Sequence, residues 1–276
     1  MKSLIPLLLL LAGCTSYEQS ELKSSTEVST SVSTTTTVST STSTSISILP
    51  VCPAKTPTGC PEKGAYQAAD ISYAVNAKLL NQLKCSGIDT IIRYYDWPGQ
   101  ESLKGKIPKD DEIALIKKYG FKILFVFQHY NQNFSTFTDS SRPAKDVAAI
   151  LQLTKKFGQP KGSGIYVGVD GDFGSSSQLA SVRTYFGSVA PKLREAGFKV
   201  GMYGGGANCT SLQKAGLIDL PCWIAASSWG WAGTKDALAA GNYGLKQKVD
   251  QTCLGESLDY NSINPKTPDV GAWNLQ

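Results

Sequence analysis

Two aspartates two positions apart, Asp170 and Asp172, carry the clearest chemical meaning in this sequence. They end an apolar run that begins at Ile165, which predicts a buried strand. Side chains two apart on a strand point to the same face, so both carboxylates are expected to lie together. One of two close carboxylates keeps its proton near neutral pH, as a general acid must. Two structural roles are the alternatives: Asp172 as the cap of the following helix, and Asp170 as the partner of Arg93.

Other kinds of site are excluded by the composition. The single histidine, His129, rules out metal sites with two histidines, and a Ser-His-Asp triad would depend on this one residue, which we expect on a loop surface. The formal net charge of +5 is too small to indicate a nucleic acid or a membrane surface as partner. No metal or organic cofactor is implied, and we expect a monomer. With 41% hydrophobic and 18% charged residues, the chain has an ordinary globular composition.

The N-terminus predicts export. Lys2 precedes an apolar run over 4–11, which is far shorter than the roughly 20 residues of a membrane-spanning helix. The tetrapeptide that ends at Cys14, Leu-Ala-Gly-Cys, resembles the bacterial lipobox, which implies a signal peptide over 1–13 and a diacylated Cys14. An ordinary secretory signal that happens to contain a cysteine is the alternative. Because Thr15 and not Asp follows, the resemblance favours the outer membrane if the cell has one, and the membrane face stays open.

A Ser/Thr-rich segment follows Cys14 and continues to about residue 50. No apolar periodicity runs through it, so it cannot bury enough surface to offset its conformational entropy. We predict that 14–50 is a flexible tether with an r.m.s. span of roughly 30–35 Å, although a mere spacer would have the same composition. The folded domain is expected over 51–276.

Six cysteines remain in this domain, and an even number in an exported protein indicates disulfides. Because no Cys-x-x-Cys spacing occurs, a zinc site is disfavoured. Fifteen pairings are possible, and spacing alone suggests Cys52 with Cys60 and Cys209 with Cys222. The remaining two are Cys85 and Cys253.

Strand-like and helix-like segments alternate through the domain. Such alternation predicts parallel strands with helical crossovers, and eight units favour an α/β fold, the (β/α)8 TIM-type barrel, with weak or missing helices after strands 6 and 7. A doubly wound sheet is the alternative, but no Gly-x-Gly-x-x-Gly follows the first strand. The predicted strands cover 66–72, 90–95, 122–128, 165–172, 199–203, 222–226, 245–249 and 258–263, and the helices cover 74–84, 109–119, 143–157, 177–196 and 208–215.

In such a barrel, functional side chains lie at the carboxyl ends of the strands. There the sequence gathers acids, amides and aromatic rings, and these can bond to sugar hydroxyls and stack on sugar C–H faces. Trp229 and Trp231, in a Gly-rich loop, are expected to be exposed, whereas Trp223 could instead pack within the barrel. The candidate substrate-binding residues are Arg93, Tyr95, Gln128, Tyr203, Trp223, Trp229, Gln247 and Asn261.

Three short motifs, at 70–72, 170–172 and 259–261, resemble those of the family 25 glycoside hydrolases, the Chalaropsis-type lysozymes. A closer resemblance, through segments 92–95, 165–172 and 200–204, is to a bacterial glycoside-hydrolase-like domain family of unknown function, a TIM barrel related to those lysozymes. The resemblance covers about residues 64 to 263.

The resemblance implies roles for four acids. Asp172 lies where the lysozymes place their acid catalyst, although they carry Glu there, which is one methylene longer. Asp170 would tune it or position the acetamido group of the substrate, and Asp70 and Asp259 would complete an acidic floor. The implied function is hydrolysis of glycosidic bonds in peptidoglycan or another N-acetylated glycan by a lipid-anchored envelope protein, whose only contact with the membrane is its lipid. A non-catalytic glycan-binding lipoprotein on a degenerate hydrolase scaffold is the alternative.

Overall fold

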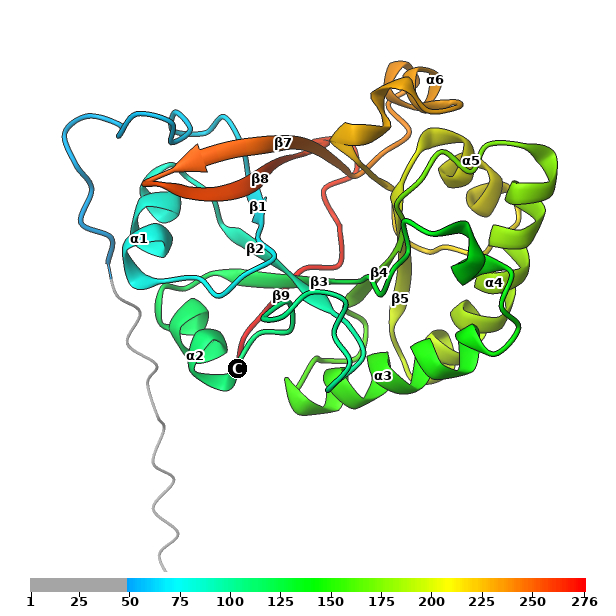
Figure 1. Ribbon diagram of the computed structural model, residues 1–276. Coiled ribbons are helices and arrows are strands. Elements are labelled where there is room, and N and C mark those ends of the chain that lie inside the picture. The colour runs from blue at the N-terminus through cyan, green and yellow to red at the C-terminus, as the bar shows by residue number, and fades with distance from the viewer. Residues whose placement is uncertain (1–48) are drawn as a thin grey trace, which may run out of the picture. The chain divides into compact units, whose positions relative to one another are not determined.

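Eight strands close into a barrel in the computed structural model, which describes residues 49–276 and, at 249 and 250, the backbone alone (Figure 1). The strand order is β2-β1-β8-β7-β6-β5-β4-β3, and pairing of β2 with β3 closes the ring, which confirms the predicted fold. A short β9 (Trp273–Asn274) pairs with the start of β3. The barrel strands are β1 (Ala68–Asp70), β2 (Thr90–Tyr95), β3 (Lys122–Phe127), β4 (Gly164–Val169), β5 (Lys199–Gly204), β6 (Trp223–Ile224), β7 (Leu245–Cys253) and β8 (Glu256–Ile263).

Five helices follow β1 to β5 and cover the outside of the sheet (Figure 1). Their ends obey local rules: Ser175, for example, begins α4 with a capping box that includes Gln178. After β6 only a short α6 forms, as predicted. The helices are α1 (Ala77–Cys85), α2 (Asp110–Lys118), α3 (Arg142–Lys156), α4 (Ser176–Glu195), α5 (Gly206–Lys214) and α6 (Thr234–Ala239), with 3-10 turns η1 (Phe134–Phe137) and η2 (Ala226–Gly230).

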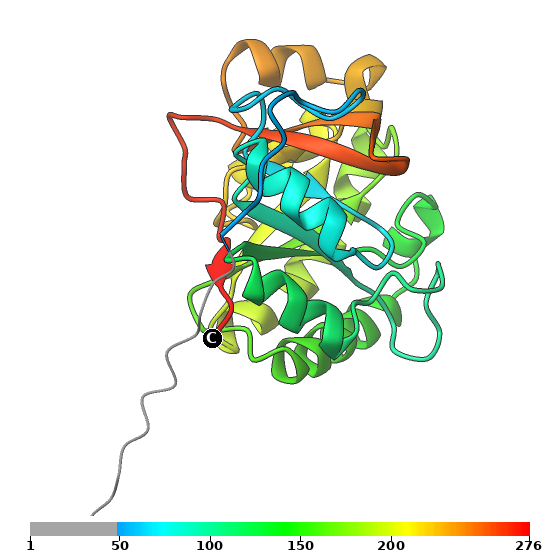
Figure 2. The same ribbon diagram turned by 90° about the vertical axis from the view of Figure 1, so that its left-hand side faces the viewer.

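The direction of the last strand differs from the prediction, because β8 runs antiparallel to both β7 and β1. Only Leu254 and Gly255 join β7 to β8, and a parallel strand would need a crossover of about a dozen residues or more. Both have a positive φ, of 56° and 85°, as a two-residue hairpin turn requires. Figure 2 shows this hairpin running above α1.

Two apolar layers, one inside the barrel and one between the sheet and the helices, show which way each strand residue points. Ile92 belongs to the cluster inside the barrel, whereas its neighbour Ile91 belongs to the cluster between sheet and helices. The same alternation places Trp223 inside and Phe125 outside. Every second residue at a strand's carboxyl end therefore faces the barrel mouth, and the residues between them face the helices.

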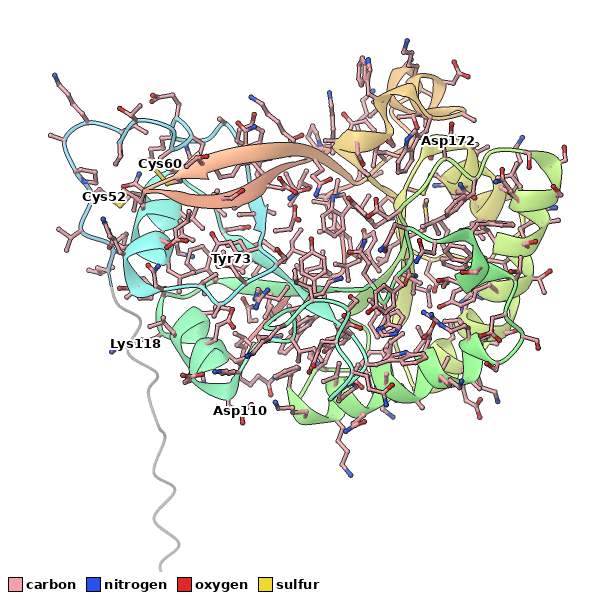
Figure 3. The ribbon with its side chains drawn as sticks, in the orientation of Figure 1. Cys52, Cys60, Tyr73, Asp110, Lys118 and Asp172 are labelled. Carbon is pink, nitrogen blue, oxygen red and sulfur yellow. A yellow bond between two sulfur atoms is a disulfide. The ribbon has the colours of Figure 1, made fainter. Side chains whose placement is uncertain are left out.

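All six cysteines of the barrel domain form disulfides, as predicted, and Cys209 pairs with Cys222. The suggested pairing of Cys52 with Cys60 is wrong: Cys52 pairs with Cys85 at the end of α1, and Cys60 pairs with Cys253 at the end of β7. The short separation of Cys52 and Cys60 in sequence did not indicate a bond between them, because the loop that carries both spans from α1 to the tip of the hairpin (Figure 3). These two bonds fasten the start of the domain to the barrel.

The predicted signal peptide, Cys14 and all but the end of the tether lie outside the described residues. Within 49–276, no helix combines the length and the apolar character needed to cross a bilayer.

Candidate active site

The centre of the barrel mouth is a pair of carboxylates on β1 and β8. Asp70 and Asp259 lie opposite each other in the antiparallel register, which brings Asp259 to this rim although its strand is reversed. The Nε2 atom of Gln247 donates to both, at 3.1 Å to Asp70 and 3.2 Å to Asp259. Asp70 also accepts bonds from Tyr94 Oη at 2.9 Å and from Asn261 Nδ2 at 2.7 Å. One amide thus holds two acids side by side.

This pair holds a proton near neutral pH. Burial first, and then the charge of Asp259, raise the pKa of Asp70 from 3.8 to about 7. The hydrogen bonds that Asp70 accepts favour its charged form but do not cancel these two effects. Asp70 is the more buried of the two, at 2% exposed, whereas Asp259 is half-buried. The pair of close carboxylates expected at 170–172 is therefore found on β1 and β8.

Asp170 is the third acid of the mouth. It directly follows β4 and accepts a bond of 2.7 Å from Gln128 Nε2. Burial raises the pKa of Asp170, while the Gln128 bond and the charge of Lys106 lower it by smaller amounts. The sequence did not predict Lys106, because it lies in the loop after β2, where no strand periodicity indicates which way a side chain points. Its Nζ donates to the carbonyl oxygen of Gln128 at 2.9 Å. Asp170 is therefore bonded to the amide of Gln128 and feels the charge of Lys106, and it is not the partner of Arg93, which pairs with Glu112.

Tyr203, at the end of β5, is influenced by the charges of all three acids. Its hydroxyl donates to Gln247 Oε1 at 3.0 Å. Burial, followed by the charges of Asp170, Asp70 and Asp259, raises the pKa of Tyr203 well above its usual value. The charges of Asp70 on β1, Asp259 on β8 and Asp170 directly after β4 thus act on one phenol group, so three of the four predicted acids come together and Asp172 does not.

Asp172 lies apart from this centre. Because β4 ends at Val169, Asp170 and Asp172 are not on one strand face. Asp172 is exposed, and its Oδ1 accepts a bond of 3.0 Å from the backbone N–H of Ala232, in the segment before α6 (Figure 3). Asp172 does not cap α4 either, since Ser175 does so. The residue predicted to be the proton donor is therefore exposed and lies outside the group of acids at the centre of the mouth.

Arg93 and Tyr95 point away from the mouth. Arg93 is fully buried, its Nε lies 2.6 Å from Glu112 Oε1, and it also donates to the carbonyl oxygen of Ile71. Tyr95 donates to Gln159 Oε1 at 2.7 Å. The residue between them, Tyr94, faces the acids, and the strand period of two would have identified it from Ile92.

The tryptophans divide between packing and exposure. Trp223 is fully buried inside the barrel, where its Nε1 donates to Asn261 Oδ1 at 2.7 Å and so orients the amide that contacts Asp70. Trp229 is 57% exposed, as expected. Trp231 is half-buried, which differs from the exposure predicted for it.

His129 was expected on a loop surface, and this was wrong, because its side chain is only 5% exposed. Its Nδ1 lies 2.5 Å from Asp96 Oδ1, and its ring stacks on Trp97 with centroids 4.0 Å apart. Asp96, buried just after β2, also accepts a 2.6 Å bond from Ser102 Oγ. Because Lys106 Nζ donates to Ser102 Oγ at 3.3 Å, this cluster supports the loop that brings Lys106 to the mouth.

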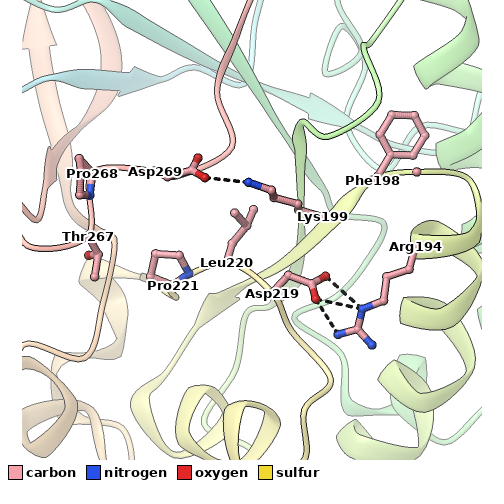
Figure 4. A pocket seen from close by; sticks show the side chains of 10 residues that line it. Arg194, Phe198, Lys199, Asp219, Leu220, Pro221, Thr267, Pro268 and Asp269 are labelled. Carbon is pink, nitrogen blue, oxygen red and sulfur yellow. Dashed lines mark hydrogen bonds and ion pairs between the residues drawn. The ribbon is translucent and has the colours of Figure 1, made fainter.

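A pocket of about 660 Å³ lies at the opposite end of the barrel, where β5 begins (Figure 4). Its charged residues form two ion pairs, Arg194 with Asp219 and Lys199 with Asp269. Polar groups at this end of a TIM barrel usually serve stability. Between residues 49 and 276, no group of three His, Cys, Asp or Glu side chains is placed to hold a metal ion.

Comparison with known proteins agrees with this architecture. The Tat-secreted protein Rv2525c of Mycobacterium tuberculosis, crystallised with HEPES, is 20% identical over 75% of this chain and 98% of its own, with a TM-score of 0.61. An uncharacterized protein of B. stearothermophilus is 15% identical over 75% of this chain and 99% of its own, with a TM-score of 0.53. Both similarities show the fold, while no curated protein matches. Residues 81–265 match the family described as the Rv2525c-like, glycoside hydrolase-like domain. Since this match covers more than half of the sequence and agrees with the resemblance in its motifs, the chain belongs to the Rv2525c-like glycoside hydrolase-like family.

Proposed function

We propose that this protein is an exported glycoside hydrolase that cleaves glycosidic bonds in peptidoglycan or another N-acetylated glycan. The observation that carries the proposal is the acid pair of Asp70 and Asp259, which holds a proton near neutral pH at the barrel mouth. Glycosidic hydrolysis requires a protonated carboxyl group as the acid and a second carboxylate close to it. Membership of the glycoside hydrolase-like family supports it.

In the proposed reaction the acid pair acts as one unit. Asp259 is the half-buried member, so it meets the substrate and protonates the leaving oxygen, while the more buried Asp70 next to it keeps the proton available. Asp170, held by Gln128, stabilises the positive charge that develops on the sugar ring or positions its acetamido group. Tyr203 orients Gln247, whose amide holds Asp70 and Asp259 side by side.

One observation favours a second function, that of a non-catalytic glycan-binding protein. Asp172, which the resemblance places at the position of the lysozyme acid, is exposed and bonded to a backbone N–H of the neighbouring loop. If the chemistry of this family depended on that position, the barrel mouth would bind a glycan without cleaving it.

Digestion of purified peptidoglycan distinguishes these functions. Asp259→Asn is expected to lower the release of reducing ends by about a hundredfold or more, the usual contribution of general acid catalysis. Asp172→Asn, the matched control, is expected to keep nearly full activity. The reverse pattern would refute the assignment of the acid, and a wild-type protein that binds peptidoglycan without releasing product would establish the second function.

Export and anchoring are part of the proposal. Three disulfides are typical of proteins that fold in an oxidising compartment, and the M. tuberculosis relative is Tat-secreted. The predicted signal peptide over 1–13 and the tether over 14–50 would leave the barrel attached to a membrane through Cys14. Labelled palmitate should be incorporated by the wild type and not by Cys14→Ala; equal incorporation by both would refute this part.

A further inference from the structure

A groove of about 420 Å³ lies on the outer side of the barrel, over β6, β7 and β8. It exists because β7 continues directly into β8: the outer faces of β1 to β5 are covered by α1 to α5, whereas the hairpin supplies no such helix (Figure 1). The side chains that give the groove its character are Tyr66, Trp229, Leu238, Lys246, Lys248 and Ser262.

Two pairs, each of an aromatic ring and a lysine, lie along this groove. Lys246 Nζ is 5.9 Å from the centre of the Trp229 ring, and Lys248 Nζ is 5.9 Å from the centre of the Tyr66 ring. The lysines are two apart on β7, so they share its outer face at a spacing of roughly 6.5–7 Å. Tyr66 is held in place by stacking on Tyr260, with centroids 5.1 Å apart.

The charge of the groove has a single sign, since its only charged lining residues in the described part of the chain are the two lysines. The exposed ring of Trp229 offers flat apolar surface to the C–H face of a sugar, the half-buried ring of Tyr66 adds apolar surface beside it, and each ring has an ammonium group near it. A neutral glycan would use the rings alone. A glycan whose sugars carry carboxylates would use the rings and both lysines.

We propose that this groove binds a carboxylate-bearing glycan strand, as a second site that extends the acidic mouth. The inference deepens the proposed function and rests on it for the glycan nature of the ligand. The two sites share β7: Gln247, which holds Asp70 and Asp259, points into the barrel, while Lys246 and Lys248 on either side of it line the groove. The mouth meets a glycosidic bond, and the groove meets the acidic sugars next to it.

The experiment uses two glycans with the same backbone and different charge. Peptidoglycan strands freed of peptide carry a lactyl carboxylate on every second sugar, and chitin oligosaccharides of equal length carry none. Binding is measured by calorimetry with the full chain carrying Asp259→Asn, so that neither probe is hydrolysed. Lys246→Ala with Lys248→Ala should weaken binding of the peptidoglycan strands about tenfold and leave chitin unchanged. The tenfold effect should shrink in about 0.5 M salt.

The matched control is Lys214→Ala with Lys235→Ala, which removes the same charge from exposed positions outside the groove. It should leave binding of both probes unchanged, and Trp229→Ala should weaken both. Equal affinity of the unsubstituted groove for the two probes, or no effect of the Lys246 and Lys248 changes, would overturn the inference. Lysine-dependent binding in a protein that releases nothing from peptidoglycan would remove the hydrolase proposal and retain the groove.

Discussion

Replacing Asp70 by Asn tests whether the barrel mouth stores a proton. The pKa of Asp70 rises from 3.8 in the unfolded chain to about 7 in the folded protein. Between pH 3.8 and about pH 7, the folded state therefore binds one more proton at Asp70 than the unfolded state does. The stabilisation from Asp70 is therefore complete below about pH 4 and is lost as the pH rises through about 7. The shift corresponds to at most about 4 kcal/mol, with no large correction for solvent because the side chain is 2% exposed.

Asp70→Asn resembles the protonated carboxyl and does not titrate. Its oxygen can accept the bond from Asn261, and its amide can donate to the hydroxyl oxygen of Tyr94. Relative to the wild type, the variant is expected to gain stability steadily from pH 4 to pH 8, by up to about 4 kcal/mol in total.

Urea unfolding followed by circular dichroism at intervals of pH would measure this difference. Asp172→Asn is the matched control for loss of a carboxylate, and it should keep the pH dependence of the wild type because Asp70 is intact. Hydrolysis of peptidoglycan by the wild type should fall as the pH rises above about 7, when the acid pair loses its proton. Stability curves of Asp70→Asn and wild type that run parallel over this range would refute the reasoning.

Three further predictions concern Tyr203 at the mouth, Arg93 between the sheet and the helices, and the disulfide between Cys60 and Cys253. Tyr203→Phe removes one hydrogen bond, so it should cost about 1 kcal/mol in urea unfolding but lower kcat at least tenfold; unchanged kcat would exclude it from the site. Arg93→Met leaves Glu112 buried without its partner and should destabilise the fold by about 3–5 kcal/mol, whereas an exposed substrate-binding role predicts almost no loss. Replacing Cys60 and Cys253 by Ala opens a link across 193 residues and should cost about 2–5 kcal/mol in thermal unfolding, while an unchanged melting temperature would show that this bond does not constrain the chain.

Much of the fold could be predicted from local pattern. The strand expected at 90–95 is β2 itself, and the helix expected at 143–157 agrees with α3 to within one residue. Such elements follow from apolar periodicity and helix ends, which are properties of neighbouring residues. The same alternation identifies Tyr94 as the residue of β2 that faces the mouth, because it lies two positions after the inward-facing Ile92. Arg93 and Tyr95 lie on the opposite face.

The pairing of distant segments was harder to predict. The Leu254-Gly255 turn makes β8 antiparallel to β7, whereas the alternation of strands and helices predicted a parallel strand there. The link between Cys60 and Cys253 depends on where the tip of that hairpin lies, which no spacing of cysteines encodes.

By itself, the sequence determined that this chain forms a barrel with acids, amides and aromatic rings at one rim, because each strand end is a local feature. Only the tertiary structure decided which acid holds a proton. A carboxylate's pKa depends on its burial and on the charges around it, and the charge that raises the pKa of Asp70 is that of Asp259, which β8 brings opposite Asp70 from far along the chain. Asp172, two residues from a buried acid in sequence, faces solvent instead, because its strand ends before it.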